Sequence, residues 1–316
     1  MIELSSEISA HLGIGATAFD RIFSLVGQRF RFREGRETLR VEIGGQNYFL
    51  KRHHGYGWKW ILKSLLTGGY PIISALSEVA IIRRLKRIGI PSVEVVGFGQ
   101  RGRNPATRQS FLLMRELVGC HDLDKLTSSW PTQPPTPKLR RVIVESLATT
   151  ARAMHSAGIN HRDFHLDHLW FEPATAEDSR PRLHVIDLHR AMHHRRVSLY
   201  WRTKDLAGLL LTAWDRGITK SDCLRFVLHY AGRSAREVFR TDRLFWRIVV
   251  WRADRLFRRE FGHPPPQPLI VPKVVERSRG SVTAFDRNLR CGRAETSNLK
   301  ACMKPASPPS RLGMPT

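Results

Sequence analysis

Two aspartates stand at the ends of short segments whose residue types could transfer a phosphoryl group. Asp163 closes a His-Arg-Asp triplet that leads into an apolar run, and Asp187 ends a second apolar run. The two carboxylates could therefore lie on neighbouring loops and converge on one site. Phosphoryl transfer needs a base near the acceptor hydroxyl and a cation that neutralises the phosphates. Asp163 as the base and Asp187 as a metal ligand would supply the acidic half of that chemistry.

A lysine at the end of a predicted strand could supply positive charge. Residues 29–33, 38–43 and 47–51 have β character and are separated by glycine-containing turns, which predicts a three-stranded meander. Lys51 ends the third strand, where a kinase-like fold keeps the lysine that binds the nucleotide phosphates. A lone lysine at a strand end is more often only solvated, so this role depends on partners elsewhere in the chain.

The turn between the first two strands is the candidate for a loop that covers the phosphates. It lacks the full G-x-G-x-x-G pattern and contains only Gly35, which Arg36 follows. The loop would therefore be minimal, and Arg36 would supply charge where glycine amides usually do.

An acidic partner for the lysine is predicted on the helix that follows. Apolar residues recur at helical spacing over 74–88 and stop before Gly89, which predicts a helix with Glu78 near its start. Glu78 could form an ion pair with Lys51, as in the kinase fold. Without that context it would be a solvated acid in the first turn.

Two more strands would complete a five-stranded antiparallel sheet. They are predicted at 93–98 and 110–114, with a basic turn between them. Residues 115–117 would then connect the sheet to the rest of the chain. The backbone groups of Glu116 and Leu117 would be available there to the adenine of a nucleotide.

The chain around Asp163 is predicted to be mainly helical. A helix over 139–157 ends at Gly158, which places Asp163 on the loop after a helix. Further helical patterns cover residues 205–215, 221–231 and 236–261. From residue 262 onward the proline-containing chain loses hydrophobic periodicity, which predicts a disordered tail.

Two basic segments are candidates for contact with an anionic partner. Residues 52–71 have the pattern of a basic amphipathic helix, which would either pack on the sheet or contact lipid. Residues 188–204 are rich in arginine and histidine. Such a segment is either a solvated surface or a surface for a negatively charged acceptor.

The composition is that of a globular chain with a large excess of positive charge. Its 316 residues, 41% of them hydrophobic, suffice for a buried core and two lobes. The net charge of +24 predicts an anionic partner: nucleic acid, a membrane surface or a phosphorylated substrate. The four scattered cysteines argue against a zinc ribbon or a disulfide scaffold. The absence of signal-peptide features and of an apolar run of about 20 residues predicts a cytoplasmic protein, peripheral to a membrane.

The chain resembles the lipopolysaccharide core heptose(I) kinase family from about residue 30 to residue 261. The segments that carry the resemblance are residues 48–53 (YFLKRH), 102–106 (GRNPA), 154–163 (MHSAGINHRD), 185–191 (VIDLHRA) and 204–206 (KDL). Together they form a specific set, whereas any one of them alone would be a weak signal.

The resemblance implies an α+β, protein-kinase-like fold of two lobes. An N-terminal arm (1–28) would precede an antiparallel-sheet N-lobe (29–117), a mainly helical C-lobe (118–261) and the tail (262–316). The implied reaction transfers the γ-phosphate of ATP, with Mg²⁺, to a hydroxyl of the first heptose of the lipopolysaccharide inner core. The implied partners are this acceptor and the anionic inner face of the inner membrane, and no nucleic acid is expected.

The resemblance also assigns roles by position. Asp163 corresponds to the catalytic base, Lys51 to the phosphate-binding lysine, Glu78 to its partner and Asp187 to the magnesium ligand. Asp205 corresponds to a buried helix acid that braces the catalytic loop. Nucleotide contacts would come from Gly35, Arg36, Glu116 and Leu117.

One position departs from ordinary protein kinases. Five residues after Asp163, where those enzymes keep an asparagine for the second metal, this chain has His168. Magnesium prefers oxygen ligands, so imidazole would be a poor substitute. The heptose kinases also carry histidine at this place, so His168 remains a candidate metal residue, and Asp167 beside it could assist.

Alternatives from other classes remain open from the sequence. His161, His165 and His168 recur at helical spacing with aspartates among them, so a zinc site of a metal-dependent hydrolase is one alternative. No distant ligand set accompanies these histidines. A basic nucleic-acid-binding protein is another alternative, although no RNP, KH, zinc-finger or helix-turn-helix signature supports it. Within the kinase class, the alternatives are a catalytically silent relative and an acceptor that is another core sugar or a protein hydroxyl.

Overall fold

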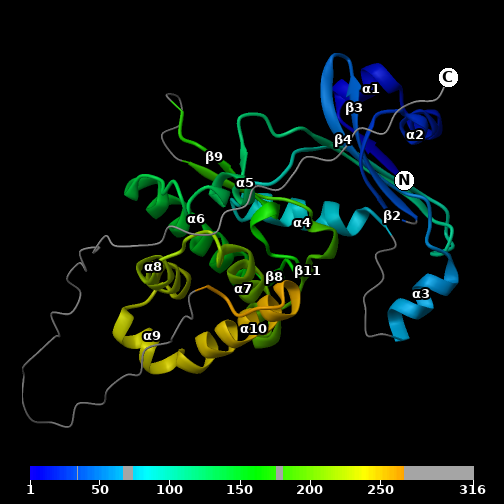
Figure 1. Ribbon diagram of the computed structural model, residues 1–316. Helices are drawn as coiled ribbons and strands as arrows, with labels where there is room; N and C mark the ends of the chain where they lie inside the picture. Colours follow the sequence, from blue (N-terminus) through cyan, green and yellow to red (C-terminus); the bar gives the residue numbers. More distant parts are fainter. Residues whose placement is uncertain (34, 67–73, 176–180, 267–316) are drawn as a thin grey trace, which may run out of the picture. The chain divides into compact units, whose positions relative to one another are not determined.

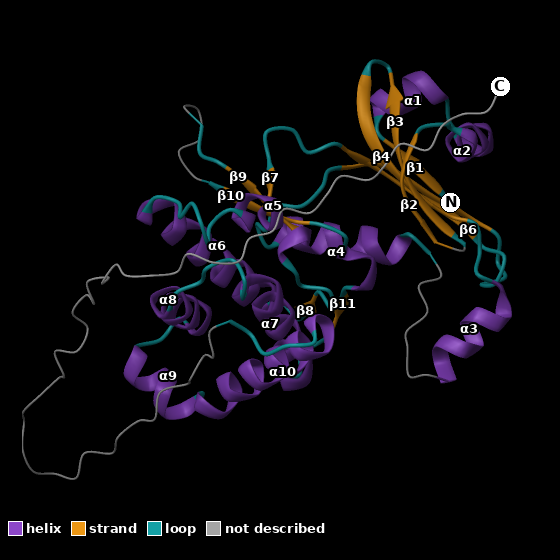
Figure 2. Ribbon diagram, in the orientation of Figure 1, coloured by secondary structure: helices purple, strands orange, loops and turns teal. Residues whose placement is uncertain are grey.

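A computed structural model describes residues 1–33, 35–66, 74–175 and 181–266 (Figure 1). They form a mixed structure of α-helices and antiparallel sheets (Figure 2). The strands are β1 (Ile2–Leu4), β2 (Gln28–Arg33), β3 (Arg36–Ile43), β4 (Gln46–His53), β5 (Val95–Arg101), β6 (Gln109–Arg115), β7 (His121–Asp122), β8 (Ile159–Asn160), β9 (Leu169–Glu172), β10 (Arg182–Val185) and β11 (Met192–His193). The α-helices are α1 (Ser6–Leu12), α2 (Gly15–Ser24), α3 (Gly57–Leu66), α4 (Leu76–Arg87), α5 (Leu123–Ser128), α6 (Pro137–Ser156), α7 (Leu199–Ala213), α8 (Lys220–Ala231), α9 (Ala235–Thr241) and α10 (Arg243–Phe261). Two short 3-10 helices, η1 (Leu166–His168) and η2 (Leu188–Arg190), lie near the predicted site residues.

The main sheet has six antiparallel strands in the order β1-β5-β6-β4-β3-β2. The predicted meander is confirmed as β2, β3 and β4, and the two later strands are confirmed as β5 and β6. The prediction of five strands was wrong by one, because Ile2 pairs with Gly99 and adds β1 to the edge of β5.

The segment expected as an N-terminal arm, residues 1–28, instead contributes to the core of this sheet. Besides β1 it forms α1 and α2, whose Ile8, Phe19 and Ile22 are buried against one face of the sheet. Ring contacts tie α2 to the central strands, since the centroids of Phe19 and Phe111 are 5.3 Å apart. Burial of these side chains removes apolar surface from water, which makes the segment part of the folded unit.

The opposite face of the sheet is covered by α4. Along β6, Phe111 points to the cluster that contains α1 and α2, whereas Leu112 belongs to the cluster that contains Val79 and Leu85 of α4. Successive residues of a strand point to opposite faces, so a strand covered on both sides reads as a continuous apolar run. The predicted helix over 74–88 is therefore confirmed as α4, and it lies against the strands that carry the site.

A continuous core joins α4 to the helical part of the chain. The same cluster includes Leu147 of α6, Phe164 and Leu188, the last of which belongs to η2. Thr136 caps α6 by accepting a hydrogen bond from the N–H of Leu139, and α6 ends just before Gly158, as predicted. The segments that follow α6 and β10 are in this way fixed against α4.

Three helix predictions needed correction. The helix expected over 236–261 is broken at Asp242, whose backbone is not helical (φ −106°, ψ 8°) and which is both the C-cap of α9 and the N-cap of α10. The helix expected from residue 205 begins earlier, at Leu199 of α7. The helix expected over 52–71 begins at Gly57, because residues 52 and 53 complete β4. Residues 67–71 of that prediction, and the tail from 267 to 316, lie outside the described residues.

No helix among the described residues is both long and apolar enough to cross a bilayer. The two described cysteines, Cys120 and Cys223, are free thiols.

Candidate active site

The ammonium of Lys51 lies between two carboxylates that come from distant parts of the chain. Its Nζ is 2.7 Å from Oε1 of Glu78 and 2.7 Å from Oδ1 of Asp187. Burial alone would lower the pKa of Lys51, but the two carboxylates outweigh burial and raise it above its usual value. The lysine is therefore charged, and its predicted partner, Glu78, is in place.

Asp187 is the most heavily contacted carboxylate of the site. Besides Lys51, its oxygens are approached by His189 Nδ1 at 2.7 Å and Arg31 Nη1 at 3.3 Å. Burial alone would raise the pKa of Asp187, but Lys51 and His189 outweigh it and hold the pKa well below its usual value. Asp187 has a φ of 55°, in the left-handed region that costs a non-glycine residue about 1–3 kcal/mol. These contacts hold Asp187 in that conformation.

The loop that carries Asp163 is braced by Asp205 from α7. The buried carboxylate of Asp205 accepts the backbone N–H of His161 at 2.7 Å and that of Arg162 at 2.8 Å. His155 of α6 lies 3.3 Å from the same carboxylate. Arg162 is left-handed, with a φ of 70°, so the two charge-assisted hydrogen bonds hold a strained turn in place. The expected contact of Asp205 with this loop is present.

Asp163 follows the strained turn and is partly open to solvent, with 26% of its side chain exposed. Nη1 of Arg190 lies 3.5 Å from both carboxylate oxygens. Burial alone would raise the pKa of Asp163, but Arg190 and the neighbouring histidines outweigh burial and lower it. The carboxylate is therefore ionised at neutral pH and can accept a hydrogen bond from a hydroxyl.

The histidines of this loop do not have the geometry of a zinc site. His161 is buried, its Nε2–H donates to the carbonyl of Ile186 at 3.0 Å, and burial lowers its pKa to about 4. Nδ1 of His168 donates to the carbonyl of Asp163 at 2.8 Å. Among the described residues, three possible metal ligands lie close together elsewhere, at the sheet of β7, β9 and β10. They are Cys120, Glu172 and His184. The geometry therefore gives no support to the metal-dependent hydrolase.

The second nitrogen of His168 lies where two carboxylates approach. Nε2 is 3.5 Å from Oδ2 of Asp167 and 3.6 Å from Oδ2 of Asp187. Because Nδ1 donates to the backbone carbonyl of Asp163, Nε2 is the ring nitrogen that faces these oxygens. The candidate metal residues, Asp187 and His168, are thus neighbours, and Asp167 lies with them.

The predicted phosphate-covering turn is packed against the chain after β4. The carbonyl of Gly35 accepts the N–H of His54 at 2.9 Å, and a Cβ at position 35 would lie 2.7 Å from the carbonyl oxygen of Gly55. Arg36 is buried and pairs across the strands with His53. Burial, together with the charges of Arg36 and Lys51, lowers the pKa of His53 to about 3. Arg36 therefore adds positive charge close to Lys51, from a buried position.

The predicted connecting segment is clamped to the sheet. Both oxygens of Glu116 accept hydrogen bonds from Arg40, at 3.0 and 2.8 Å. The backbone N–H of Glu116 donates to the carbonyl of Asn47 at 3.3 Å. That N–H is therefore engaged within the sheet, and Leu117 follows it along the chain.

Arg31 is a site residue that the sequence reasoning missed. It lies on β2, and its side chain, 51% exposed, reaches Asp187. A β-bulge lies between Arg29 and Arg31, so Arg29 pairs with Leu39 whereas Arg31 pairs with Thr38, which itself pairs with Lys51. Arg31 therefore shares a face with Lys51, and the simple alternation of residues along β2 gives no signal for this.

Comparison with known proteins agrees with this geometry. Residues 23–230 match the model of the lipopolysaccharide kinase (Kdo/WaaP) family. The lipopolysaccharide core heptose(I) kinase WaaP of Pseudomonas aeruginosa is 39% identical over 249 residues, which cover 78% of this chain and 92% of that protein. The enzyme of the same name from Escherichia coli K12 is 36% identical over 260 residues, 82% of this chain and 98% of that protein.

A solved structure is similar as well. The structure of WaaP in complex with acyl carrier protein superposes with a TM-score of 0.68 at 35% sequence identity. The match covers 81% of this chain and 99% of that chain. The resemblance stated from the motifs is therefore confirmed.

Replacing Asp205 with asparagine tests the brace of the loop that carries Asp163. An amide offers one oxygen, so Asp205→Asn leaves one of the two buried backbone N–H groups facing an NH₂ group. We expect a loss of about 2–3 kcal/mol in the free energy of unfolding, measured by urea denaturation, because a buried donor stays unsatisfied. The matched control is Asp215→Asn, whose carboxylate is 43% exposed and lies 3.4 Å from Arg216. A loss at Asp215 equal to that at Asp205 would show that Asp205 has no special bracing role.

Proposed function

The chain belongs to the lipopolysaccharide kinase (Kdo/WaaP) family, and we propose that it transfers the γ-phosphate of ATP to a hydroxyl of the first heptose of the lipopolysaccharide inner core. The observation that carries this proposal is the ion pair of Lys51 with Glu78 and Asp187, beside the braced loop of Asp163. The matching relatives are named as heptose(I) kinases and are covered over almost their whole length. The proposed acceptor is accordingly a sugar hydroxyl.

A protein-kinase-like arrangement of two lobes is part of this proposal. The main sheet with α4 would form the N-lobe, residues 29–117, and the helical part would form the C-lobe, residues 118–261. Supporting this division, β6 ends at Arg115, and the short strands and helices that follow belong to other sheets or to helical packing. Residues 1–28 are assigned to the N-lobe, because Ile8 and Phe19 are buried on its sheet.

Asp163 is proposed to orient the acceptor hydroxyl and to take its proton. The hydroxyl oxygen attacks the γ-phosphorus, the bond from that phosphorus to the β–γ bridging oxygen breaks, and ADP leaves with the bond's electron pair. The proton of the hydroxyl passes to the carboxylate of Asp163. The low pKa of Asp163 makes it a weak base, which suits late proton transfer, after the bond to phosphorus has begun to form.

Lys51 is proposed to bind the phosphates of ATP. An ammonium has three hydrogens, so Nζ can keep its contact with Glu78 while it donates to a phosphate oxygen. Arg31 of β2, whose Nη1 lies 3.3 Å from Oδ2 of Asp187, would add a second positive charge. Buried cationic donors that are already oriented stabilise developing charge more than solvated ones.

Magnesium is the expected metal of such a kinase, and the donor set fits it in part. Oδ2 of Asp167 and Oδ2 of Asp187 lie 3.5 and 3.6 Å from Nε2 of His168, and carboxylate oxygens are the ligands that magnesium prefers. Among the described residues these three ligand atoms are not all within 4.8 Å of one another. Asp187 would hold the ion, with Asp167 and His168 beside it. When bound, the ion would neutralise charge on the phosphate oxygens.

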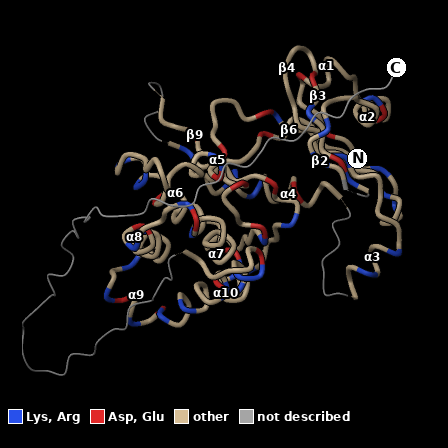
Figure 3. Tube along the Cα trace, in the orientation of Figure 1, with Lys and Arg blue, Asp and Glu red and all other residues tan. Residues whose placement is uncertain are grey.

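A membrane contact through α3 is the proposed basis for location on the inner face of the inner membrane. The exposed apolar residues of this helix are Trp58, Trp60, Leu62, Leu65 and Leu66. Lys59 and Lys63 lie among them, and the basic residues of α3 are visible in Figure 3. Exposed tryptophan and leucine with interleaved lysine is the pattern of a helix that lies in an anionic lipid surface. This observation favours lipid contact over packing on the sheet.

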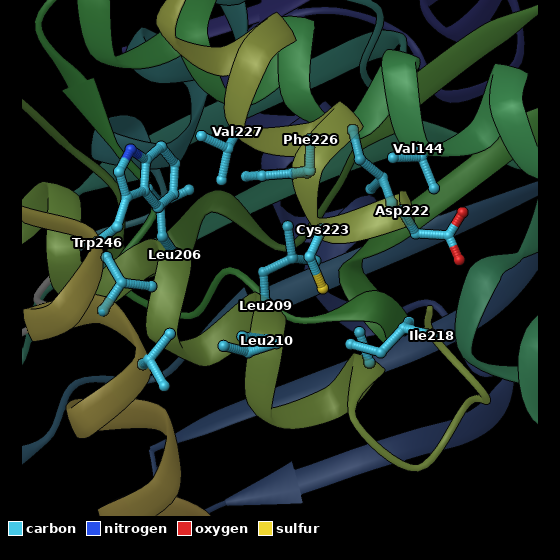
Figure 4. Close-up of a pocket in the computed structure, with 14 residues that line it drawn as sticks. Val144, Leu206, Leu209, Leu210, Ile218, Asp222, Cys223, Phe226, Val227 and Trp246 are labelled. Carbon is cyan, nitrogen blue, oxygen red and sulfur yellow. The ribbon is translucent and has the colours of Figure 1, made fainter. Parts of the chain in front are cut away.

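An acyl carrier protein is a second proposed partner. The solved relative is a complex with such a protein. This chain has an apolar cavity of about 130 Å³ between α6, α7, α8 and α10. Figure 4 shows Leu209, Phe226 and Cys223 among the side chains that surround it. Apolar cavities stay dry and accept hydrocarbon, so an acyl chain has the right chemistry for this space.

Phosphate transfer to the acceptor tests the reaction. With γ-labelled ATP, Mg²⁺ and dephosphorylated inner-core lipopolysaccharide, label should enter the core sugar. Asp163→Asn should lower kcat by about 10²–10⁴-fold with little change in ATP affinity, because it removes only the proton acceptor. Lys51→Met should also weaken ATP binding. Asp254→Asn is the control, at a half-buried aspartate of α10 whose carboxylate pairs with Arg258. Near-normal turnover of Asp163→Asn would refute the assigned base, and binding of ATP without labelled core sugar would point to another acceptor.

Vesicle binding tests the role of α3. The double variant Trp58→Ser, Leu62→Ser should bind vesicles rich in phosphatidylglycerol at least about tenfold more weakly than the wild type, because it removes apolar area that the lipid would bury. Trp251→Ser is the matched control, since Trp251 is 59% exposed and Trp58 is 52% exposed. Cosedimentation gives the partition coefficients. Equal loss in both variants would remove α3 as the contact.

Binding of an acylated carrier protein tests the cavity. Ala213→Phe should fill part of the space and weaken binding of the acylated protein about tenfold, because the acyl chain loses its apolar site. Binding of the unacylated protein should not change. Ala174→Phe, at an exposed position, is the control. Calorimetry gives the dissociation constants. Unchanged affinity of a folded Ala213→Phe variant for the acylated protein would exclude the cavity.

A further inference from the structure

Three cationic side chains gather around Asp163. Arg162 precedes it in the chain, Arg190 contacts it at 3.5 Å, and Lys204 of α7 lies near enough to interact with its charge. Burial lowers the pKa of Lys204, and repulsion from Arg162 and Arg190 lowers it further. The three charges are therefore close enough to repel one another. Such a cluster is costly in the absence of a negative partner.

The carboxylates that act on these cations do not balance them. The two oxygens of Asp205 accept the backbone N–H groups of His161 and Arg162. Asp163 is reserved for the acceptor hydroxyl in the proposed reaction. The three cations therefore have two carboxylates near them. Asp163 must be free for the acceptor hydroxyl, and Asp205 is already bonded to the backbone.

The side chains of Arg162 and Lys204 are held in place by Trp201. The guanidinium carbon of Arg162 lies 4.8 Å from the centre of the tryptophan ring, and Nζ of Lys204 lies 5.1 Å from it. Cations over an aromatic face are attracted by its negative quadrupole. Nη1 of Arg162 otherwise contacts the sulfur of Met192, a weak acceptor, at 3.3 Å. Both cations are thus positioned while they retain capacity to bind an anion.

We propose that Arg162, Arg190 and Lys204 form a subsite for an anionic group of the acceptor, a carboxylate or a phosphate, that fixes the acceptor hydroxyl against Asp163. This inference rests on the proposed kinase function. The 3.5 Å contacts of Arg190 with Asp163 are long for a charged hydrogen bond, so Arg190 can turn from the aspartate to the incoming anion. Its movement leaves the base free for the hydroxyl.

The acceptor, rather than ATP, is the source of this anion. The phosphates of ATP have cations of their own at a different carboxylate, because Lys51 and Arg31 both lie at Asp187. Lys204 belongs to α7 and shares Trp201 with Arg162, on the side of Asp163. Two sets of cations on two carboxylates match the two substrates of a phosphoryl transfer.

The test combines one variant with acceptors of different charge. Lys204→Met keeps the length and apolar stem of the side chain and removes its charge. The acceptors are inner-core lipopolysaccharide that is unphosphorylated at its first heptose, here called the native acceptor, the same material with carboxylates converted to neutral amides, and the same material after phosphatase treatment has removed its other phosphates. Lys125→Met, at a side chain that is 84% exposed, is the control. KM and kcat for each acceptor and for ATP are measured for all three proteins.

With the native acceptor, Lys204→Met should raise the acceptor KM about tenfold or more, since it removes a charged contact, and should leave the KM for ATP unchanged. When the anionic group of the acceptor has been neutralised, the acceptor KM of the wild type should rise to the same extent. The acceptor KM of Lys204→Met should then rise no further. Amidation or phosphatase treatment identifies the group as carboxylate or phosphate. Lys125→Met should behave as the wild type.

Other outcomes would overturn the subsite. A raised KM for ATP in Lys204→Met, with an unchanged acceptor KM, would assign the cations to the nucleotide. Equal use of native and both neutralised acceptors by the wild type would show that no anion is recognised. Failure of the proposed function is distinguishable, because the wild type would then transfer no label even to the native acceptor.

Discussion

The ammonium of Lys51, held between Glu78 and Asp187, is the interaction on which the rest of the site depends. It joins β4 to α4 and to the segment after β10, because Glu78 and Asp187 lie 27 and 136 residues after Lys51 in the chain. Breaking a buried ion pair by removal of one partner is strongly destabilising, because an uncompensated charge remains. The three elements must therefore be positioned together. The apolar packing of α4 on β5 and β6, and of Leu188 in the same cluster, supplies that positioning.

A second constraint lies in the backbone. Arg162 and Asp187 are the described non-glycine residues with positive φ, and each stands beside or at a proposed site residue. Strain of this kind persists only where surrounding contacts fix it. At Arg162 the contacts are the hydrogen bonds to Asp205, and at Asp187 they are the cations on its carboxylate. The segments that present Asp163 and Asp187 are thus preorganised by different means, a helix carboxylate and an ion-pair cluster.

The parts of the fold and site that could be predicted from the sequence are those with local patterns or specific motifs. The meander, α4 and α6 follow from periodicity and from glycine punctuation, and the pairing of Lys51 with Glu78 follows from the family resemblance. Arg31 could not be assigned in this way, because only the twist and register of β2 bring it to Asp187. The place of residues 1–28 depends on burial of Ile8 and Phe19 against distant strands, which no local pattern encodes. The break at Asp242 was missed because apolar periodicity continues across it.

In the proposed reaction, the charges around Asp163 would link recognition of the acceptor to its activation. Arg190 and nearby histidines lower the pKa of Asp163, so the carboxylate is ionised but weakly basic before the acceptor arrives. An acceptor anion bound by Arg190 and Lys204 would offset the field of these cations and withdraw Arg190 from the carboxylate. Both effects raise the affinity of Asp163 for a proton. The base would then become stronger only when a correctly charged acceptor is in place, so that the same cations that select the acceptor also restrain phosphate transfer to water.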